Sequence, residues 1–255
     1  MSALFLAAAQ SMTNPFVPMQ RSWSVAALFE GLGRDSVTCA PAEARAAEPR
    51  LWIDLAAEWD ARLLEAFILE RDRGLSGDFH VFLEAWARDE ERHTEGLLRL
   101  YSLVTGEDQA SVRGRLMERR GDFRPVEPLL EDEFQLLVLL AYDEAMSTAG
   151  YREDIPFYQS LGPAAFGRLL RELKNDEAVH YRNAVELLVL AHSDRVEEVP
   201  RAVERVVRFD EAQAEYQATF VLDHATDQFD GATMERVGRS VVRAIQRRMR
   251  AALEA

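Results

Sequence analysis

The chain has 255 residues, which is enough for one large domain with a buried core. Glycine and proline are sparse, at 13 and 9 residues, while alanine, leucine, glutamate and arginine are abundant, so the composition favours helices throughout. The net charge of −14 argues against nucleic acid and anionic membranes as partners, because both bind basic surfaces.

The only cysteine is Cys39, which excludes a disulfide framework and a cysteine-based zinc cluster. Residues 3–9 are apolar but too short to span a bilayer, and no positive charge precedes them as it would in a secretory signal. We therefore expect a cytoplasmic protein.

Residues 1–48 mix short apolar stretches with turn formers and predict an N-terminal extension with two short helices. This extension could cover one end of a bundle or form a partly ordered arm. From Pro49 the pattern becomes one of long helices, so residues 49–255 are predicted to form one all-α domain. The predicted helices lie at residues 49–73, 78–105, 108–121, 128–152, 163–192, 197–226 and 231–253.

The helical pattern has two predicted breaks and one stretch that is apolar throughout. Ile155-Pro156 and Gly162-Pro163 bracket a connector between two of the long helices. Residues 136–141 are apolar on every side of their helix, which is typical of a helix buried on most sides. No stretch has the alternating pattern of a strand.

Residues 89–93 and 176–180 share the pattern Asp-Glu-x-x-His. Residues three apart lie on one face of a helix, so each copy aims a carboxylate and an imidazole at one point. Both faces are otherwise apolar, and buried groups of this kind are costly unless they are paired or bind a metal. The alternative is two surface Glu–His pairs, which would lie on polar faces. The doublet therefore predicts that Glu90, His93, Glu177 and His180 supply most of a two-metal site.

A bundle of this kind needs one further glutamate from each of two other helices. Glu144 is the candidate in the helix at 128–152, with an ion pair to an arginine as the alternative. In the first helix we choose Glu65, which places the ligand near mid-length, and keep Glu58 and Glu70 as alternatives. Oxygen-rich ligation with one histidine per metal suits two iron ions (Fe2+/Fe3+), or manganese in one or both positions.

The order Glu, Glu-x-x-His, Glu, Glu-x-x-His resembles the ferritin-like di-iron carboxylate superfamily. Within it the chain is most similar to the soluble acyl-[acyl-carrier-protein] desaturases, over roughly residues 50–195. Four segments carry this resemblance: residues 65–67, residues 86–98 from Trp86 to a double leucine, residues 142–147 and residues 176–180. The resemblance implies a ferritin-like four-helix bundle with additional C-terminal helices and an N-terminal extension.

The same resemblance assigns a role to the aspartates that precede the two motif glutamates. It implies that Asp176 hydrogen-bonds His93 and that Asp89 hydrogen-bonds His180. Histidines that bind metals usually donate their other N–H to a carboxylate. The alternative is that both aspartates lie on helix surfaces.

Ser147 and Thr148 follow Glu144 by one turn. The resemblance implies that a hydroxyl here lines the oxygen pocket and assists proton delivery, although either could bond a carbonyl of its own helix. We expect an O2-dependent di-iron oxidase or oxygenase that desaturates or hydroxylates an organic substrate, of the acyl type by resemblance. The alternatives are an amine N-oxygenase, a ferroxidase or iron-storage protein, a radical-generating reductase subunit and a metal-free scaffold.

Expected partners are a small-molecule or acyl-type substrate and an external electron donor. A carrier protein is a further candidate partner, and a homodimer is the assembly we consider.

Overall fold

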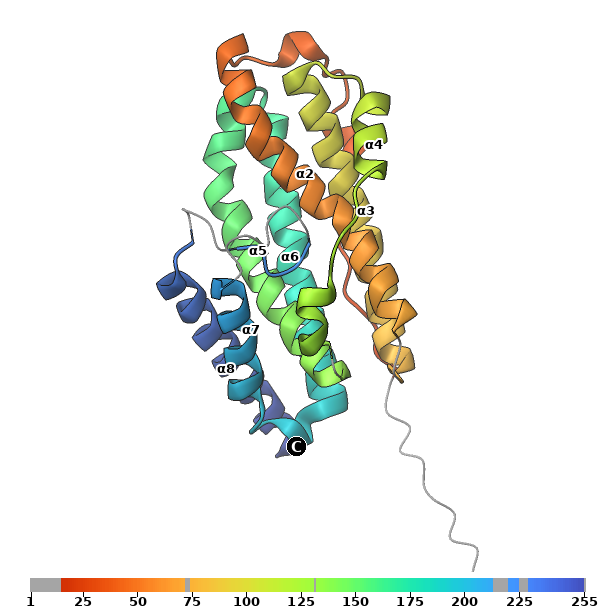
Figure 1. Cartoon of the computed structure of the whole chain (residues 1–255), viewed down its shortest axis with the longest axis vertical. Helices are drawn as coiled ribbons and strands as arrows, with labels where there is room; N and C mark the ends of the chain where they lie inside the picture. Colours follow the sequence, from red (N-terminus) through yellow and green to blue (C-terminus); the bar gives the residue numbers. More distant parts are fainter. Residues whose placement is uncertain (1–14, 72–73, 131, 213–219, 225–228, 255) are drawn as a thin grey trace, which may run out of the picture.

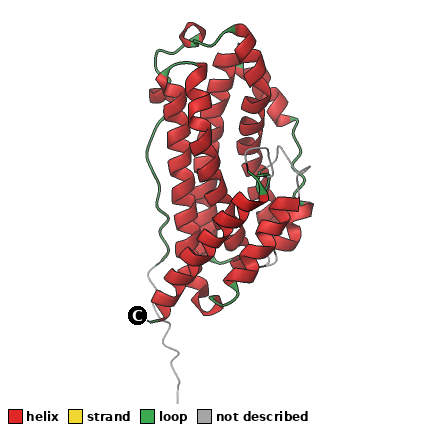
Figure 2. Ribbon diagram, turned by 90° about the vertical axis from the view of Figure 1, so that its left-hand side faces the viewer, coloured by secondary structure: helices red, strands yellow, loops and turns green. Residues whose placement is uncertain are grey.

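The computed structural model describes residues 15–71, 74–130, 132–212, 220–224 and 229–254. All regular structure in these residues is helical, with no strand among them (Figure 2). The all-α prediction is confirmed at this level. Within the same residues, no helix combines the length and the apolar character needed to cross a membrane.

Four helices of 29 or 30 residues run side by side along the molecule (Figure 1). They are α2 (Pro41–Glu70), α3 (Gly77–Thr105), α5 (Glu133–Leu161) and α6 (Ala164–His192). Short links make α2 and α3 one antiparallel pair and α5 and α6 another, and α3 packs on α6. A methyl group at Gly96 of α3 would come within 2.6 Å of Leu169, so glycine permits the close approach of α3 to α6.

Side-chain caps define where several helices begin. Ser76 accepts a hydrogen bond from the backbone N–H of Phe79 at the start of α3, and Asp132 does the same for Gln135 at the start of α5. Each cap satisfies one of the free N–H groups of the first turn. Gly106 ends α3 with φ of 79°, in the left-handed region that glycine adopts without strain.

The smaller helices cover the ends and one side of these four. They are α1 (Val25–Leu28), α4 (Gln109–Met117), α7 (Val199–Ala212) and α8 (Gly231–Leu253), with 3-10 turns at Arg34–Ser36, Arg124–Leu129 and Ser193–Arg195. Helices α7 and α8 pack on each other and on α5, and α8 also packs on α6 (Figure 1).

Two helices pass through prolines at which the sequence predicts boundaries. Helix α2 begins at Pro41 rather than Pro49, and α5 continues through Pro156 to Leu161. An internal proline removes one backbone hydrogen bond. Burial offsets this loss, since Leu51 in α2 and Tyr158 in α5 are almost completely buried. The predicted helix at 197–226 is shorter, because α7 ends at Ala212 and residues 220–224 are not helical; residues 213–219 lie outside the described chain.

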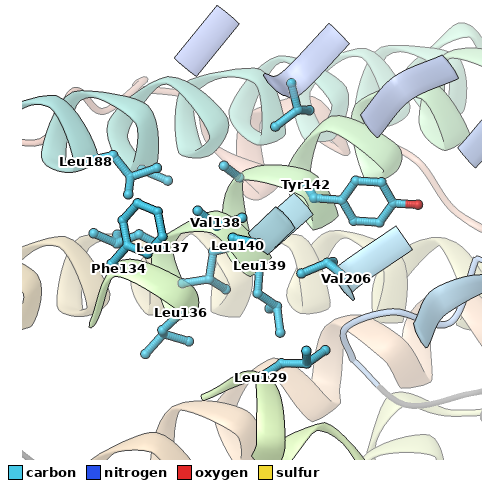
Figure 3. Close-up of a cluster of buried hydrophobic side chains, with 14 of the residues drawn as sticks. Leu129, Phe134, Leu136, Leu137, Val138, Leu139, Leu140, Tyr142, Leu188 and Val206 are labelled. Atoms are coloured by element: carbon cyan, nitrogen blue, oxygen red, sulfur yellow. The ribbon is translucent and has the colours of Figure 1, made fainter. Parts of the chain in front are cut away.

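The middle of α5 is buried on all sides, as the apolar pattern of residues 136–141 predicts. Figure 3 shows these side chains packed with Leu129, Leu188 and Val206, with the Tyr142 hydroxyl pointing away from them. That hydroxyl donates a hydrogen bond to Asp210 Oδ2 at 2.8 Å, which satisfies the one polar atom of the ring.

The apolar core consists of two clusters stacked along the bundle. On α3 one cluster ends at Trp86 and the other begins at Leu97. On α6 the corresponding limits are Leu173 and Ala184. The interval between the clusters contains the buried acids and histidines of both Asp-Glu-x-x-His segments. A polar layer near the middle of the bundle therefore lies between the two apolar clusters, one toward each end of the bundle.

Candidate metal centre

Four carboxylates and two imidazoles converge in this layer, and each is at most 4% exposed. They come from all four long helices: Glu58 from α2, Glu90 and His93 from α3, Glu144 from α5, and Glu177 and His180 from α6. In each of two overlapping groups, one potential ligand atom per residue lies within 4.8 Å of the others. Five of the six residues chosen from the sequence are therefore brought together.

The first group surrounds Nδ1 of His93. This nitrogen lies 3.3 Å from Glu58 Oε2, 3.2 Å from Glu90 Oε2 and 3.3 Å from Glu177 Oε1. A cation among these atoms would have one nitrogen and three carboxylates as neighbours.

The second group surrounds Nδ1 of His180. This nitrogen lies 3.1 Å from Glu90 Oε1, 3.4 Å from Glu144 Oε2 and 3.0 Å from Glu177 Oε2. Glu90 and Glu177 thus offer one oxygen to each group, while Glu58 and Glu144 each belong to one. If two cations were bound, Glu90 and Glu177 could serve both of them, and Glu58 and Glu144 could each serve one.

Several atoms that face this centre are buried without a hydrogen-bond partner in the described part of the chain. They are Glu58 Oε2, both oxygens of Glu90, His93 Nδ1 and Glu144 Oε2. Each such atom costs about 1–3 kcal/mol if it stays unsatisfied. Four carboxylates carry the charge that two divalent cations neutralise, so the donor set fits a pair of such ions.

The pKa values of the cluster also show that its buried charges lack partners in the metal-free protein. Burial is the main reason that the pKa values of Glu58 and Glu144 lie well above the usual range. Burial opposes charge on His93 and His180, yet their pKa values are raised because carboxylates surround both rings. Ligands must lose their protons to bind a metal, so cations and these protons compete for the same atoms.

Two buried aspartates contact the outer nitrogens of the histidines. Asp176 Oδ2 lies 3.2 Å from His93 Nε2, and Asp89 Oδ2 lies 3.3 Å from His180 Nε2. These are the two pairings expected from the sequence. A proton on Nε2 donated to the aspartate leaves the lone pair of Nδ1 directed at the centre.

Asp176 is the most heavily bonded acid in this region. Besides His93, it accepts hydrogen bonds from Trp23 Nε1 at 2.6 Å, from Arg92 at 2.8 Å and from Arg21 at 3.0 Å. Burial opposes its charge, but the bond from His93 and the other donors hold the pKa of Asp176 below its usual range. Arg92 also lies 2.7 Å from Asp89, so one guanidinium joins the two aspartates.

The chain before α1 covers this side of the centre. The side chain of Asn183 in α6 accepts from the backbone N–H of Met19 at 2.9 Å and donates to its carbonyl at 2.8 Å. The Trp23 ring stacks on His93 with an angle of 17° between planes. The described part of the extension therefore lies along α3 and α6 rather than only at a bundle end, and residues 1–14 lie outside the described chain.

Two aromatic residues hold the terminal carboxylates. Trp86 Nε1 donates to Glu144 Oε1 at 2.7 Å, and the Tyr151 hydroxyl donates to Glu58 Oε1. The role of Tyr151 was not predicted, although it follows Glu144 by seven residues and so lies on the same helix face. Trp23 and Arg21 had no such signal, because they come from a segment without helical periodicity.

The choice of Glu65 as the ligand from α2 is wrong, because Glu58 occupies that place. Glu65 lies two turns further along α2 and is only partly buried, and burial, together with the nearby charge of Glu84, raises its pKa. Glu70 is exposed. The predicted helix begins at Pro49, which places Glu65 near its middle. Helix α2 begins at Pro41 instead, and the residue of α2 that lies beside Glu90 is Glu58.

The two hydroxyl residues after Glu144 differ in their surroundings. Ser147 lines a cavity that also reaches Glu58. Thr148 does not line it, and its Oγ1 is buried without a hydrogen-bond partner among the described residues. Their proposed part in oxygen chemistry stays a prediction.

Comparison of the chain with the profiles of known protein families, with curated proteins and with solved structures found no match. The functional assignment therefore depends on the geometry of the centre itself.

Proposed function

We propose that this chain is a ferritin-like di-iron protein that uses O2 to oxidise an organic substrate. The observation that carries the proposal is the sharing of Glu90 and Glu177 between two buried groups that each contain one histidine. Oxygen-rich donors with one imidazole per metal suit iron or manganese, and no thiolate belongs to the cluster. Two ferrous ions held there would supply electrons for the reduction of O2, with an external donor restoring them.

The residues around the centre would orient the ligands, hold a proton beside the metals and exclude water. Asp89 and Asp176 orient the two imidazoles. Trp86 fixes one oxygen of Glu144, and Tyr151 holds a proton at Glu58 Oε1. The two apolar clusters exclude water from both ends of the polar layer. The substrate reaction expected from the sequence is desaturation or hydroxylation.

A ferroxidase that acts on iron alone is the second candidate, and a surface groove favours it. The groove has a volume of about 520 Å³, lies between α2 and α3, and reaches Glu58 and Glu90. Six glutamates, among them Glu65 and Glu84, and three arginines line it, so its net charge is negative, which suits the passage of a cation.

An anaerobic Fe(II) titration of the full chain tests the metal centre. We expect saturation at two ions per chain, followed by a change in visible absorption when O2 is added. The absence of saturable binding would refute the proposal. Product analysis after single turnover with acyl and amine substrates separates the two candidates, because a ferroxidase leaves every organic compound unchanged.

A further inference from the structure

A cavity of about 160 Å³ lies between α2, α5, residues 220–224 and Phe229. Its inner wall includes Glu58, whose Oε2 atom is buried and has no hydrogen-bond partner within the described chain. Ser147 and Tyr151 also line it. A molecule in this cavity would therefore lie beside the proposed metal centre, on the side of the Glu58 and His93 group.

The wall of the cavity is acidic. Besides Glu58 it contains four aspartates, at positions 54, 143, 154 and 223, and one histidine, His224. None of the described residues in the wall is an arginine or a lysine. The wall thus presents an excess of negative charge to anything inside.

Three of these groups have their charge satisfied within the protein. Asp154 forms an ion pair with Arg50. Asp143 accepts a hydrogen bond from the backbone N–H of Leu222 at 2.7 Å. His224 is bound by Asp210 at 3.0 Å, so its positive charge is already matched.

Asp54 and Asp223 remain. In the described part of the chain, neither has an arginine, lysine or histidine at ion-pair distance, and Asp54 accepts a hydrogen bond from the Tyr158 hydroxyl. Burial is the main reason that the pKa of Asp54 is raised to about 7, and the same holds for Asp223, whose pKa is also about 7. A cation inside the cavity would lower this penalty at the carboxylate that it contacts.

The rest of the wall and the size of the cavity limit what that cation can be. Ile53, Phe220 and Phe229 supply apolar surface. An apolar cavity of about 150 Å³ holds a molecule the size of benzene. A long acyl chain does not fit this space, whereas a small aryl or alkyl group with one charged end does.

We propose that this cavity binds a small organic ammonium ion, with its charge against the acidic wall that includes Asp54 and Asp223 and its apolar part toward Phe220 and Phe229. The inference rests on the proposed function in one respect, since it makes this ammonium ion the substrate of the oxidase. It replaces the expected acyl-type substrate by an amine.

The test compares three probes of one shape, benzylammonium, benzyl alcohol and benzoate, by calorimetric titration at pH 8 under anaerobic conditions into the full chain loaded with Fe(II). We expect benzylammonium to bind about tenfold or more tightly than benzyl alcohol, and benzoate to bind most weakly. The double variant Asp54→Asn/Asp223→Asn should lose about tenfold or more in benzylammonium affinity and keep its affinity for benzyl alcohol.

The matched control is Asp122→Asn/Asp194→Asn, which removes the same charge from two exposed positions and should leave all three affinities unchanged. Circular dichroism confirms that each variant is folded. Equal binding of benzoate and benzylammonium, or an unchanged double variant, would overturn the proposal. Iron stoichiometry is measured on the same samples. Two ions per chain without ammonium preference would overturn only the substrate class, whereas ammonium preference without iron would overturn the oxidase.

Discussion

Replacing Glu58 by glutamine should remove one of the two metal ions, while the same change at Glu65 should remove none. Glu58 contributes a terminal oxygen to the His93 group alone, and the His180 group keeps all four of its donors. At an effective dielectric constant of about 20, two unit charges about 4 Å apart attract each other by about 4 kcal/mol, which is a lower bound for a divalent ion. That energy corresponds to a loss of about a thousandfold in affinity for the first position.

The assay is anaerobic Fe(II) titration with metal analysis after equilibrium dialysis. Wild type and Glu65→Gln should both saturate at two ions per chain, and Glu58→Gln should retain one tightly bound ion. The pair is well matched, because both residues lie on α2 and both changes remove one charge. Glutamine still accepts a hydrogen bond from Tyr151, so the local packing is preserved. If Glu65→Gln lost an ion, or Glu58→Gln bound two with unchanged affinity, the assignment of the ligands from α2 would be refuted.

Four further outcomes are expected. Asp176→Asn should weaken metal binding by about 10–100-fold in a chelator competition, because the amide orients His93 less firmly; unchanged affinity would contradict the orienting role. Removing the metal with a chelator should lower the melting temperature by about 10 °C for each ion if the ions are present at about a thousand times their dissociation constant, and equal melting of both forms would count against a buried centre. His224→Gln should cost about 3–5 kcal/mol below about pH 6.5, because it breaks the buried pair with Asp210. Since the pKa of His224 is raised to about 10, the difference in unfolding free energy between wild type and this variant should fall as the pH rises from about 6.5 to about 10. Urea titrations would show the same difference at every pH in this range if the pair were neutral. Leu140→Ala should cost about 2–5 kcal/mol in the same assay, and a loss below about 1 kcal/mol would contradict its burial.

Features set by neighbouring residues could be predicted from the sequence. The three-residue spacing within Glu90–His93 and Glu177–His180 puts each pair on one helix face in any helix, and the apolar flanks indicate that the face is buried. The middle of α5 and the bounds of α3, α6 and α8 follow from the same local periodicity and capping signals. These signals predict four of the six clustered side chains, and the apolar helix around Glu144 predicts a fifth.

Only the tertiary structure decided which glutamate of α2 joins them. Glu58 and Glu65 lie two turns apart on nearly the same face, and helical periodicity does not distinguish levels along a helix. The level at which α2 meets α3 depends on packing between helices, as does the continuation of α2 through Pro49. Contacts between segments far apart in the chain, such as Trp23 with Asp176, and the acidic cavity beside Glu58 likewise exist only once the helices are assembled. Spacing along one helix is a property of the local chain, whereas alignment between helices is a property of the packed core.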